Sequence, residues 1–476
     1  MKKILSLLLA VVMLLSLCAC GKSDTPAGQN AAIHEPAPIP SKLLVGFGKV
    51  CITPEDPVKL NGYTTNRTSD KVLDDIYITC IAMKSEEETA LIFSQDTQNS
   101  SAVVTPNLRQ AVGSALDVPQ TNIFVAATGT YSGPNLKATG ETAEKYMEFY
   151  LDAAVQAATQ AMDDLAPSVL YSATTEVEGL NFVHHYKMVD GTVEDGYYGF
   201  FDREIEGHVI DADKTMRLVK AERDGKPAIL LVNWQCRPTL AYYEDKNAIS
   251  ADFIGYMRNK IEADTGMKVA YFTGAYGDLS PTSKIESEDP GLGVKEYGEK
   301  LAEYAINAQS SMAVLGGETI GAYSSQYKCP VNHLDEDMID LAKQVTSQRK
   351  ALGDQAADKL AKQLGFRSVY HAANISSRIN RTEKYTFEVA ALRMGNLGML
   401  MSPSPIFNAA GKAAINKAPT DFTFIICEAN AAWEVLPTEE AFSYGGYETD
   451  VSYFAKGSAE FILRLANEML LTTTDD

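Results

Sequence analysis

The sequence predicts an α/β fold, a layered mixed sheet with flanking helices. Along most of the 476 residues, apolar strand-like runs alternate with segments whose apolar residues recur at every third and fourth position. In several places two strand-like runs follow each other without a helix between them, which predicts antiparallel pairs beside parallel ones. Hydrophobic residues make up 45% of the chain, which suffices for one large domain or two smaller ones.

The expected elements follow from these periodicities. Strands are predicted at residues 44–52, 76–83, 90–94, 123–127, 169–174, 228–234, 269–272, 318–327, 387–394, 398–401 and 422–427. Helices are predicted at residues 106–116, 144–165, 253–265, 294–309, 335–352, 355–364 and 455–471. No internal repeat and no second linker interrupts this alternation.

The amino terminus has the organisation of an export signal. Two lysines precede an apolar segment at residues 4–17, and Cys18-Ala19-Cys20-Gly21 follows. The segment is too short to span a bilayer. Residues 17–20 (LCAC) resemble a bacterial lipobox, which implies a signal peptide at residues 1–19 and a lipid on Cys20. An ordinary secretory signal cut nearby is the alternative.

Residues 20–41 are then the lipidated cysteine and a flexible tether, because Pro, Ala, Ser and Asp dominate there. Residues 42–476 form the folded domain. The expected location is the cell membrane, with the protein held by its lipid anchor and facing outside the cytoplasm.

The charge and the cysteines exclude several classes of protein. A formal net charge of −20, or −22 without Lys2 and Lys3, repels nucleic acid and anionic headgroups, so no nucleic-acid partner is expected and the lipid must provide attachment. The alternative interpretation of this net charge is that it only keeps the protein soluble. Beyond residue 20, five cysteines without close pairs fit neither a disulfide framework nor a zinc knuckle: Cys51, Cys80, Cys236, Cys329 and Cys427.

The stretch at residues 271–282 (YFTGAYGDLSPT) is a candidate for chemistry. Gly274 and Gly277 allow a tight turn after a buried strand, and the turn brings Asp278 and Ser280 to the end of that strand. Ligand crevices of open α/β sheets lie at such ends. Alternatively, Ser280 is a helix N-cap with Pro281 at the first helical position, and Asp278 braces the turn through backbone amides.

Several motifs together resemble the amino-terminal catalytic domain of the neutral/alkaline, non-lysosomal ceramidase family. They are residues 46–54 (GFGKVCITP), 60–63 (LNGY), 74–77 (DDIY), Asp96, 132–134 (SGP), 233–239 (NWQCRPT), 250–256 (SADFIGY), 277–281 (GDLSP), 436–441 (LPTEEA) and 445–448 (GGYE). The resemblance implies a ceramidase catalytic-domain-like α/β fold. Family members hydrolyse the amide of ceramide, a sphingolipid, with a zinc ion and a serine.

When the family's site residues are compared with this chain one at a time, few of them are present. Ser280 occupies the position of the serine, and Tyr447 that of a tyrosine ligand. Gly129 and Tyr131 stand where the family has the two histidines of a Thr-His-Thr-His-Ser-Gly-Pro signature, the first of them a zinc ligand. Arg237 replaces the second histidine ligand, and Ser404 or a neighbour the glutamate. Arginine offers no lone pair to zinc.

A metal is therefore not expected at the family position. Outside it, His184 and His185 are adjacent and, if extended, point to opposite faces, so they are not expected to share an ion. His34 belongs to the tether, and His208, His333 and His371 are interpreted as surface or structural histidines.

Three functions remain open. The first is a surface pseudoenzyme with a ceramidase-like fold and a pocket for a lipid or a small anionic ligand, where Arg237 and Tyr131 replace zinc and histidine. The second is an amidohydrolase that cleaves ceramide or another N-acyl compound through Ser280. The third is a structural or partner-binding surface protein.

Overall fold

The computed structural model describes residues 41–62, 66–101, 103–197, 204–285, 287–378 and 383–471. The predicted signal peptide, Cys20, the tether up to residue 40, His34 and Tyr63 lie outside these ranges. Contacts divide the chain into the units Met1–Pro38 and Ile39–Asp476, and the fold is that of the second unit.

The larger sheet has nine strands and mixes parallel with antiparallel pairs. Its order is β16 (Lys268–Thr273), β14 (Lys226–Trp234), β13 (Thr215–Arg223), β8 (Ala166–Glu176), β1 (Leu44–Cys51), β5 (Tyr77–Lys84), β6 (Thr89–Gln95) and β7 (Ile123–Ala127), with β18 (Ala313–Val314) beside β8. The pairs β6–β7 and β14–β16 are parallel. This arrangement confirms the predicted mixed sheet.

A second sheet has four strands, β19 (Ile320–Pro330), β20 (Lys384–Met394), β21 (Leu397–Met401) and β22 (Phe422–Ile426). Its last pair, β21–β22, is parallel. Short strands complete the structure: β2 (Lys59–Leu60), β3 (Arg67–Thr68), β4 (Lys71–Val72), β9 (Phe182–Val183), β10 (His185–Met188), β11 (Val193–Asp195), β12 (Ile205–His208), β15 (Ala248–Ile249) and β17 (Leu279–Ser280).

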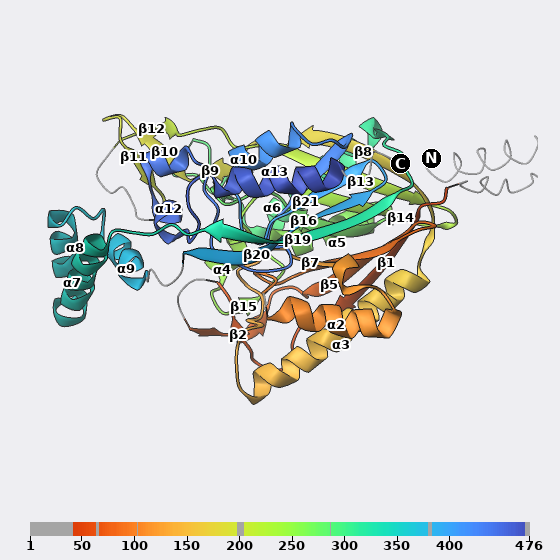
Figure 1. Cartoon of the computed structure of the whole chain (residues 1–476), viewed down its shortest axis with the longest axis horizontal. Coiled ribbons are helices and arrows are strands. Elements are labelled where there is room, and N and C mark those ends of the chain that lie inside the picture. The colour runs from red at the N-terminus through yellow and green to blue at the C-terminus, as the bar shows by residue number, and fades with distance from the viewer. Residues whose placement is uncertain are drawn as a thin grey trace, which may run out of the picture. The chain divides into compact units, whose positions relative to one another are not determined.

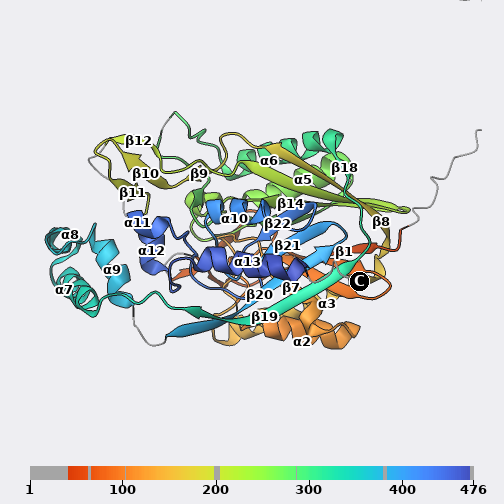
Figure 2. The ribbon, with the colours of Figure 1, turned by 45° about the horizontal axis from the view of Figure 1, so that its top comes forward.

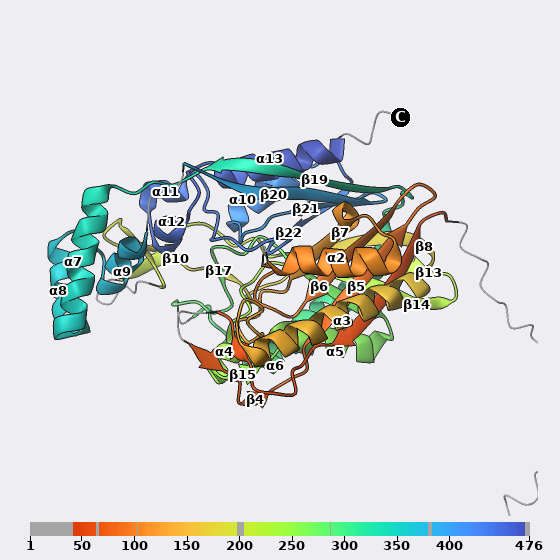
Figure 3. The ribbon, with the colours of Figure 1, turned by 60° about the horizontal axis from the view of Figure 1, so that its bottom comes forward.

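Helices cover the outer faces of both sheets, so that the layers run helix, sheet, sheet, helix (Figure 3). The outer face of the larger sheet carries α2 (Val104–Leu116), α3 (Glu141–Asp163), α5 (Phe253–Thr265) and α6 (Val294–Ala308). The second sheet is covered by α10 (Asn408–Ile415) and α13 (Ser458–Leu471) (Figure 2).

The central strands are continuous apolar runs in the sequence because both of their faces are buried. In β14, Ile229 and Leu231 point into the core between the sheets, while Leu230 and Val232 pack under α5 and α6. Phe424 of β22, in the opposite sheet, belongs to the same buried cluster as Ile229 and Leu231. Each such side chain contributes about 1.5–3 kcal/mol when fully buried.

The GFG motif at residues 46–48, within β1, has a packing reason. A Cβ on Gly48 would lie 1.9 Å from the carbonyl oxygen of Ala157, and one on Gly46 would lie 2.0 Å from that of Ala161. Helix α3 can therefore cross β1 only where the strand carries no side chain.

A separate helical group, the α7–α9 cassette, is inserted between β19 and β20 and lies at one end of the domain (Figure 1). It consists of α7 (Glu336–Leu352), α8 (Asp354–Gln363) and α9 (Val369–Ser377). The cassette has a small core of its own, formed by Ile339, Ala342, Val345, Ala357, Ala361, Phe366, Val369, Ala372 and Ile375.

Most predicted elements appear within a few residues of the expected bounds. The elements that were not predicted include β13, α9, α10 and three short helices, α4 (Leu240–Glu244), α11 (Ala441–Tyr444) and α12 (Tyr447–Val451). The predicted helix after Ser280 is wrong, since the chain bends there and the next helix is α6. The five cysteines of the described chain are free thiols. None of the helices in the described ranges combines the length and apolar character needed to cross a membrane.

Candidate ligand cavity

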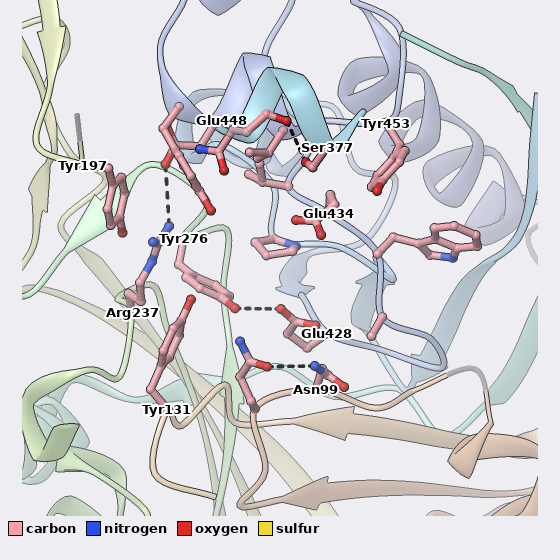
Figure 4. A pocket seen from close by; sticks show the side chains of 18 of the residues that line it. Asn99, Tyr131, Tyr197, Arg237, Tyr276, Ser377, Glu428, Glu434, Glu448 and Tyr453 are labelled. Carbon is pink, nitrogen blue, oxygen red and sulfur yellow. Dashed lines mark hydrogen bonds and ion pairs between the residues drawn. The ribbon is translucent and has the colours of Figure 1, made fainter. Parts of the chain in front are cut away.

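A cavity of about 940 Å³ lies at the carboxyl ends of strands from both sheets (Figure 4). Its floor comes from loops that directly follow β6, β7, β14, β16 and β22, which carry Asn99, Tyr131, Arg237, Tyr276 and Glu428 in that order. The turn after β16 thus reaches the cavity, as the strand-end rule predicts, but it does so with Tyr276.

Helices form the facing wall. The α7–α9 cassette provides Arg349, Tyr370, Asn374 and Ser377, and the short helix α12 (Tyr447–Val451) provides Tyr447, Glu448 and Val451. Elements that are far apart in sequence therefore share one cavity.

The lining is aromatic and polar. Of its 22 residues, seven are aromatic, six carry acidic or basic groups and four carry amide or hydroxyl groups. The other five are small apolar residues, namely Ala373, Pro405, Ala432, Val435 and Val451. Leu, Ile, Met and Phe are absent from the lining formed by the described residues, so these residues build no extended aliphatic wall.

Arg237 is held in place by three groups. Its Nη2 donates to the carbonyl oxygen of Gly277 at 2.9 Å and lies 3.9 Å from Oε1 of Glu448. Its guanidinium carbon lies 5.0 Å from the ring centroid of Tyr197. Figure 4 shows Arg237 between Tyr131 and Tyr197, pointing toward Glu448. A buried arginine positioned in this way can recognise a carboxylate or a phosphate.

Glu448 lies behind Arg237 and contacts both members of a buried histidine pair. Its Oε1 is 2.7 Å from Nε2 of His184, and its Oε2 is 3.1 Å from Nε2 of His185. Despite burial, the two imidazoles hold the pKa of Glu448 well below its usual range. We call these three residues the His–His–Glu cluster.

The expectation that His184 and His185 face apart is wrong. Their ring centroids are only 4.7 Å apart. Strand β9 ends at Val183 and β10 begins at His185, so the alternation of an extended strand does not apply at His184.

Glu428 contributes an uncharged carboxyl group to the cavity. Its side chain is 5% exposed and accepts a hydrogen bond of 2.8 Å from the hydroxyl of Tyr276. Burial raises the pKa of Glu428 to about 8, so the carboxyl group is mostly protonated at neutral pH. The residue has a φ of 54°, which is strained for a side chain with a Cβ.

Ser280 and Asp278 lie outside the lining. Oγ of Ser280 accepts from the backbone amide of Thr282 at 3.2 Å and lies 3.3 Å from its hydroxyl, which forms a local turn in place of the expected helix cap. The Asp278 carboxylate accepts from the backbone and side-chain amides of Asn408 at 2.7 and 2.6 Å. Asp278 therefore braces the start of α10.

The family's zinc position does not fit a metal in this chain. Gly129 has a φ of 90°, a conformation that histidine rarely adopts, and Arg237 brings a cation. Ser404 is fully buried and lies outside the cavity lining, although its neighbour Pro405 contributes to it. Only Tyr131, Arg237 and Tyr447, of the positions carried over from the family, meet in the cavity.

Sequence reasoning missed Glu428, Tyr276 and the His–His–Glu cluster. Glu428 follows strand β22 directly, so the strand-end rule could have identified it. Nothing in the local sequence pairs His184 and His185 with Glu448, which is more than 260 positions away.

Several motif residues prove to be structural. Asp96 forms a buried ion pair with Arg258, whose Nη1 is 3.0 Å from Oδ1. Asp74 accepts from the hydroxyl of Ser250 and from the amide of Ala251. The first contact holds the segment after β6 against α5, and the second holds the segment before β5 against the residues that precede α5.

No model of a known protein family matches the sequence, and a search among curated proteins gives no match either. Solved structures do match. The neutral ceramidase of Pseudomonas aeruginosa has a TM-score of 0.66 at 15% identity, over 91% of this chain and 74% of the ceramidase chain. A ceramidase complexed with C2 has a TM-score of 0.65 at 15% identity, over 91% and 75% of the two chains. This protein therefore has the fold of the neutral ceramidases.

Proposed function

We propose that the protein is a surface lipoprotein whose ceramidase-like domain binds a small anionic ligand in the cavity and does not hydrolyse ceramide with zinc. One observation carries the proposal. Tyr131 and Arg237, which stand where the family has histidines, line the same cavity as Tyr447. A guanidinium in place of a metal keeps a positive charge there but supplies no Lewis acid.

The lining supports a polar ligand over a two-chain lipid. Each methylene group of an acyl chain gains about 0.8 kcal/mol only when it leaves water for an apolar surface. Here the apolar lining consists of two alanines, two valines and one proline beside the aromatic rings. A compact ligand with an anionic group and hydroxyl groups matches the arginine, the amides and the protonated Glu428 better.

No geometric observation favours the alternative, an amidohydrolase that acts through Ser280. Its hydroxyl is engaged with Thr282, and the Asp278 carboxylate is bonded to Asn408. A serine nucleophile needs a base or a metal beside it.

The test is calorimetric titration of the full-length protein in mild detergent with a metal chelator present. The probes are inorganic phosphate and glucose 6-phosphate, with glucose as the uncharged control. We expect glucose 6-phosphate to bind at least about tenfold more tightly than glucose, since a charge-assisted arginine contact contributes about 1.5–3 kcal/mol.

Arg237→Gln should abolish this preference, and Arg237→Lys should restore only part of it because lysine lacks the planar fork. Arg349→Gln is the matched control. It removes an equal charge from the same lining, but Arg349 is already paired with Asp354 at 2.8 Å. If Arg237→Gln left the binding of both anions unchanged, the proposal would fail.

A further inference from the structure

We propose that His184, His185 and Glu448 form a binding site for one divalent transition-metal ion, with Zn²⁺ as the probe. The three residues differ from positions 129, 237 and 404, where the ceramidase resemblance would place zinc ligands. The inference goes beyond anion binding in the cavity and does not depend on it.

The donor atoms are already gathered. One ligand atom from each of the three residues lies within 4.8 Å of the other two. Nε2 of His184 lies 2.7 Å from Oε1 of Glu448 and Nε2 of His185 lies 3.1 Å from Oε2, so both imidazole nitrogens face the same carboxylate. Zinc bonds to imidazole nitrogen and carboxylate oxygen are about 2.0–2.2 Å long, so small side-chain rotations would admit an ion.

The cluster has unmet bonding capacity. His184 is 4% exposed, and His185 and Glu448 are each 1% exposed. Within the described chain, Oε2 of Glu448 has no hydrogen-bond partner, although it lies 3.1 Å from Nε2 of His185. Nδ1 of each imidazole has no partner among the described residues either, but it lies on the other side of the ring and would not contact an ion held by Nε2. Buried polar atoms rarely remain unsatisfied, and an ion or an ordered water is the usual partner.

The donor set indicates the class of metal. Two imidazoles and one carboxylate suit zinc and other first-row transition metals, whereas Mg²⁺ and Ca²⁺ prefer all-oxygen sites. Three protein ligands also leave a coordination position open, as in catalytic zinc sites.

Glu448 connects this site to the cavity, because it belongs to both. Arg237 approaches the carboxylate only to 3.9 Å, since the Gly277 carbonyl and the Tyr197 ring hold its guanidinium. An ion on Glu448 and the charge of Arg237 would then act together on an anion in the cavity.

The first measurement is metal binding by the full-length protein in mild detergent. After treatment with a chelator, the protein is titrated with Zn²⁺ against a chromophoric competitor, and separately with Co²⁺, whose visible spectrum reports its coordination. We expect one Zn²⁺ per chain and a Co²⁺ spectrum with nitrogen and oxygen ligands.

Variants assign the site. Loss of a residue that only supports a metal ligand weakens binding by about 10–100-fold. His185→Ala and Glu448→Gln each remove a proposed ligand itself, so each should weaken Zn²⁺ binding at least about 100-fold. His333→Ala and Cys51→Ser are the controls, since both side chains are exposed metal-binding groups outside the cluster. They should bind Zn²⁺ as the wild type does.

Three results would overturn the proposal: no stoichiometric Zn²⁺, a preference for Ca²⁺ or Mg²⁺, or equal losses in the controls. If the cluster variants fail to fold, the melting temperature of the wild-type protein with and without Zn²⁺ still tests the proposal. Saturating Zn²⁺ at about 100 times its dissociation constant should stabilise the fold by about 2.7 kcal/mol, and an unchanged melting temperature would exclude the site. Because the anion titrations are made with chelator, the two proposals fail independently.

Discussion

Nη2 of Arg237 lies 3.9 Å from Oε1 of Glu448, where the open cavity meets the buried His–His–Glu cluster. The distance is too long for a hydrogen bond, so the pair is held by charge and by the surrounding contacts. An anion that enters the cavity would therefore compete with the Glu448 carboxylate for the guanidinium. The contacts that hold the guanidinium in place also leave it at the edge of the cavity, where it can meet a ligand.

A side chain at position 129, where the ceramidase resemblance has a histidine, should cost stability. Gly129 has a φ of 90°, while a Cβ there would meet its nearest atoms only at 3.5 Å. The penalty of a side chain is therefore conformational, about 1–3 kcal/mol. We expect Gly129→Ala to lower the free energy of unfolding in urea by that amount. Gly207→Ala is the control, because an added Cβ there meets nothing within 4 Å. Equal effects at the two positions would contradict the argument.

Stability should depend on pH through Glu428. The folded chain binds this proton more tightly than the unfolded chain, because the pKa is about 8 in the fold and about 4.3 in an unfolded chain. Its contribution is therefore complete at acidic pH and falls as the pH rises to about 8, by up to about 1.4 kcal/mol per unit.

Urea unfolding between about pH 5 and pH 8 tests this effect. The free energy of unfolding of wild type should decline more steeply with pH than that of Glu428→Gln, which keeps an acceptor for Tyr276. An exposed glutamate, Glu55→Gln, serves as the control and should follow the wild type. Parallel slopes for wild type and Glu428→Gln would show that burial does not shift this carboxyl group.

The buried pair of Arg258 and Asp96 should be essential to stability. Both side chains are at most 1% exposed. Arg258→Met leaves Asp96 buried without its partner, which costs about 3–5 kcal/mol. Lys260→Met on the same helix removes a partner from the exposed pair with Asp264 and should change stability by less than about 1 kcal/mol. Similar midpoints of chemical denaturation for the two variants would refute this assignment.

Ceramide turnover should be absent and insensitive to Ser280. With Zn²⁺ supplied, we expect the release of fatty acid from a short-chain ceramide to match the blank for both wild type and Ser280→Ala. The reason is that Ser280 lies outside the cavity lining and is bonded to Thr282. Turnover by wild type that disappears in Ser280→Ala would establish the amidohydrolase instead.

Membrane attachment should depend on Cys20 alone. Cys20→Ser removes the predicted acceptor of the lipid, so the protein should leave the detergent-rich phase in a phase-partition assay. Cys18→Ser changes a cysteine that the cleaved signal would carry away, and it should partition as the wild type does. An equal effect of both substitutions would mean that a different feature anchors the protein.

Sequence periodicity predicted the layers well because the strands are buried on both faces and the long helices are amphipathic. It failed for α9 and α10, which have nine and eight residues and too few turns to show a period. It also missed β13, where Arg217 and Arg223 interrupt the apolar pattern and satisfy their charges within the fold.

The candidate site was only partly predictable. Arg237 and Tyr131 follow from the motifs in which they occur, and the cavity indeed brings them together. The histidine pair depends on a break between β9 and β10 and on a helix from the far end of the chain. Such long-range contacts leave no periodic trace in the sequence, so that only the fold reveals them.

The α7–α9 cassette gives the cavity one wall that is independent of the sheets. Because its small core is its own, mutations there can reshape the wall without disturbing the layers beneath. Ligand preference can therefore drift while the scaffold stays fixed. The insertion between β19 and β20 is therefore the segment to exchange when engineering a new specificity.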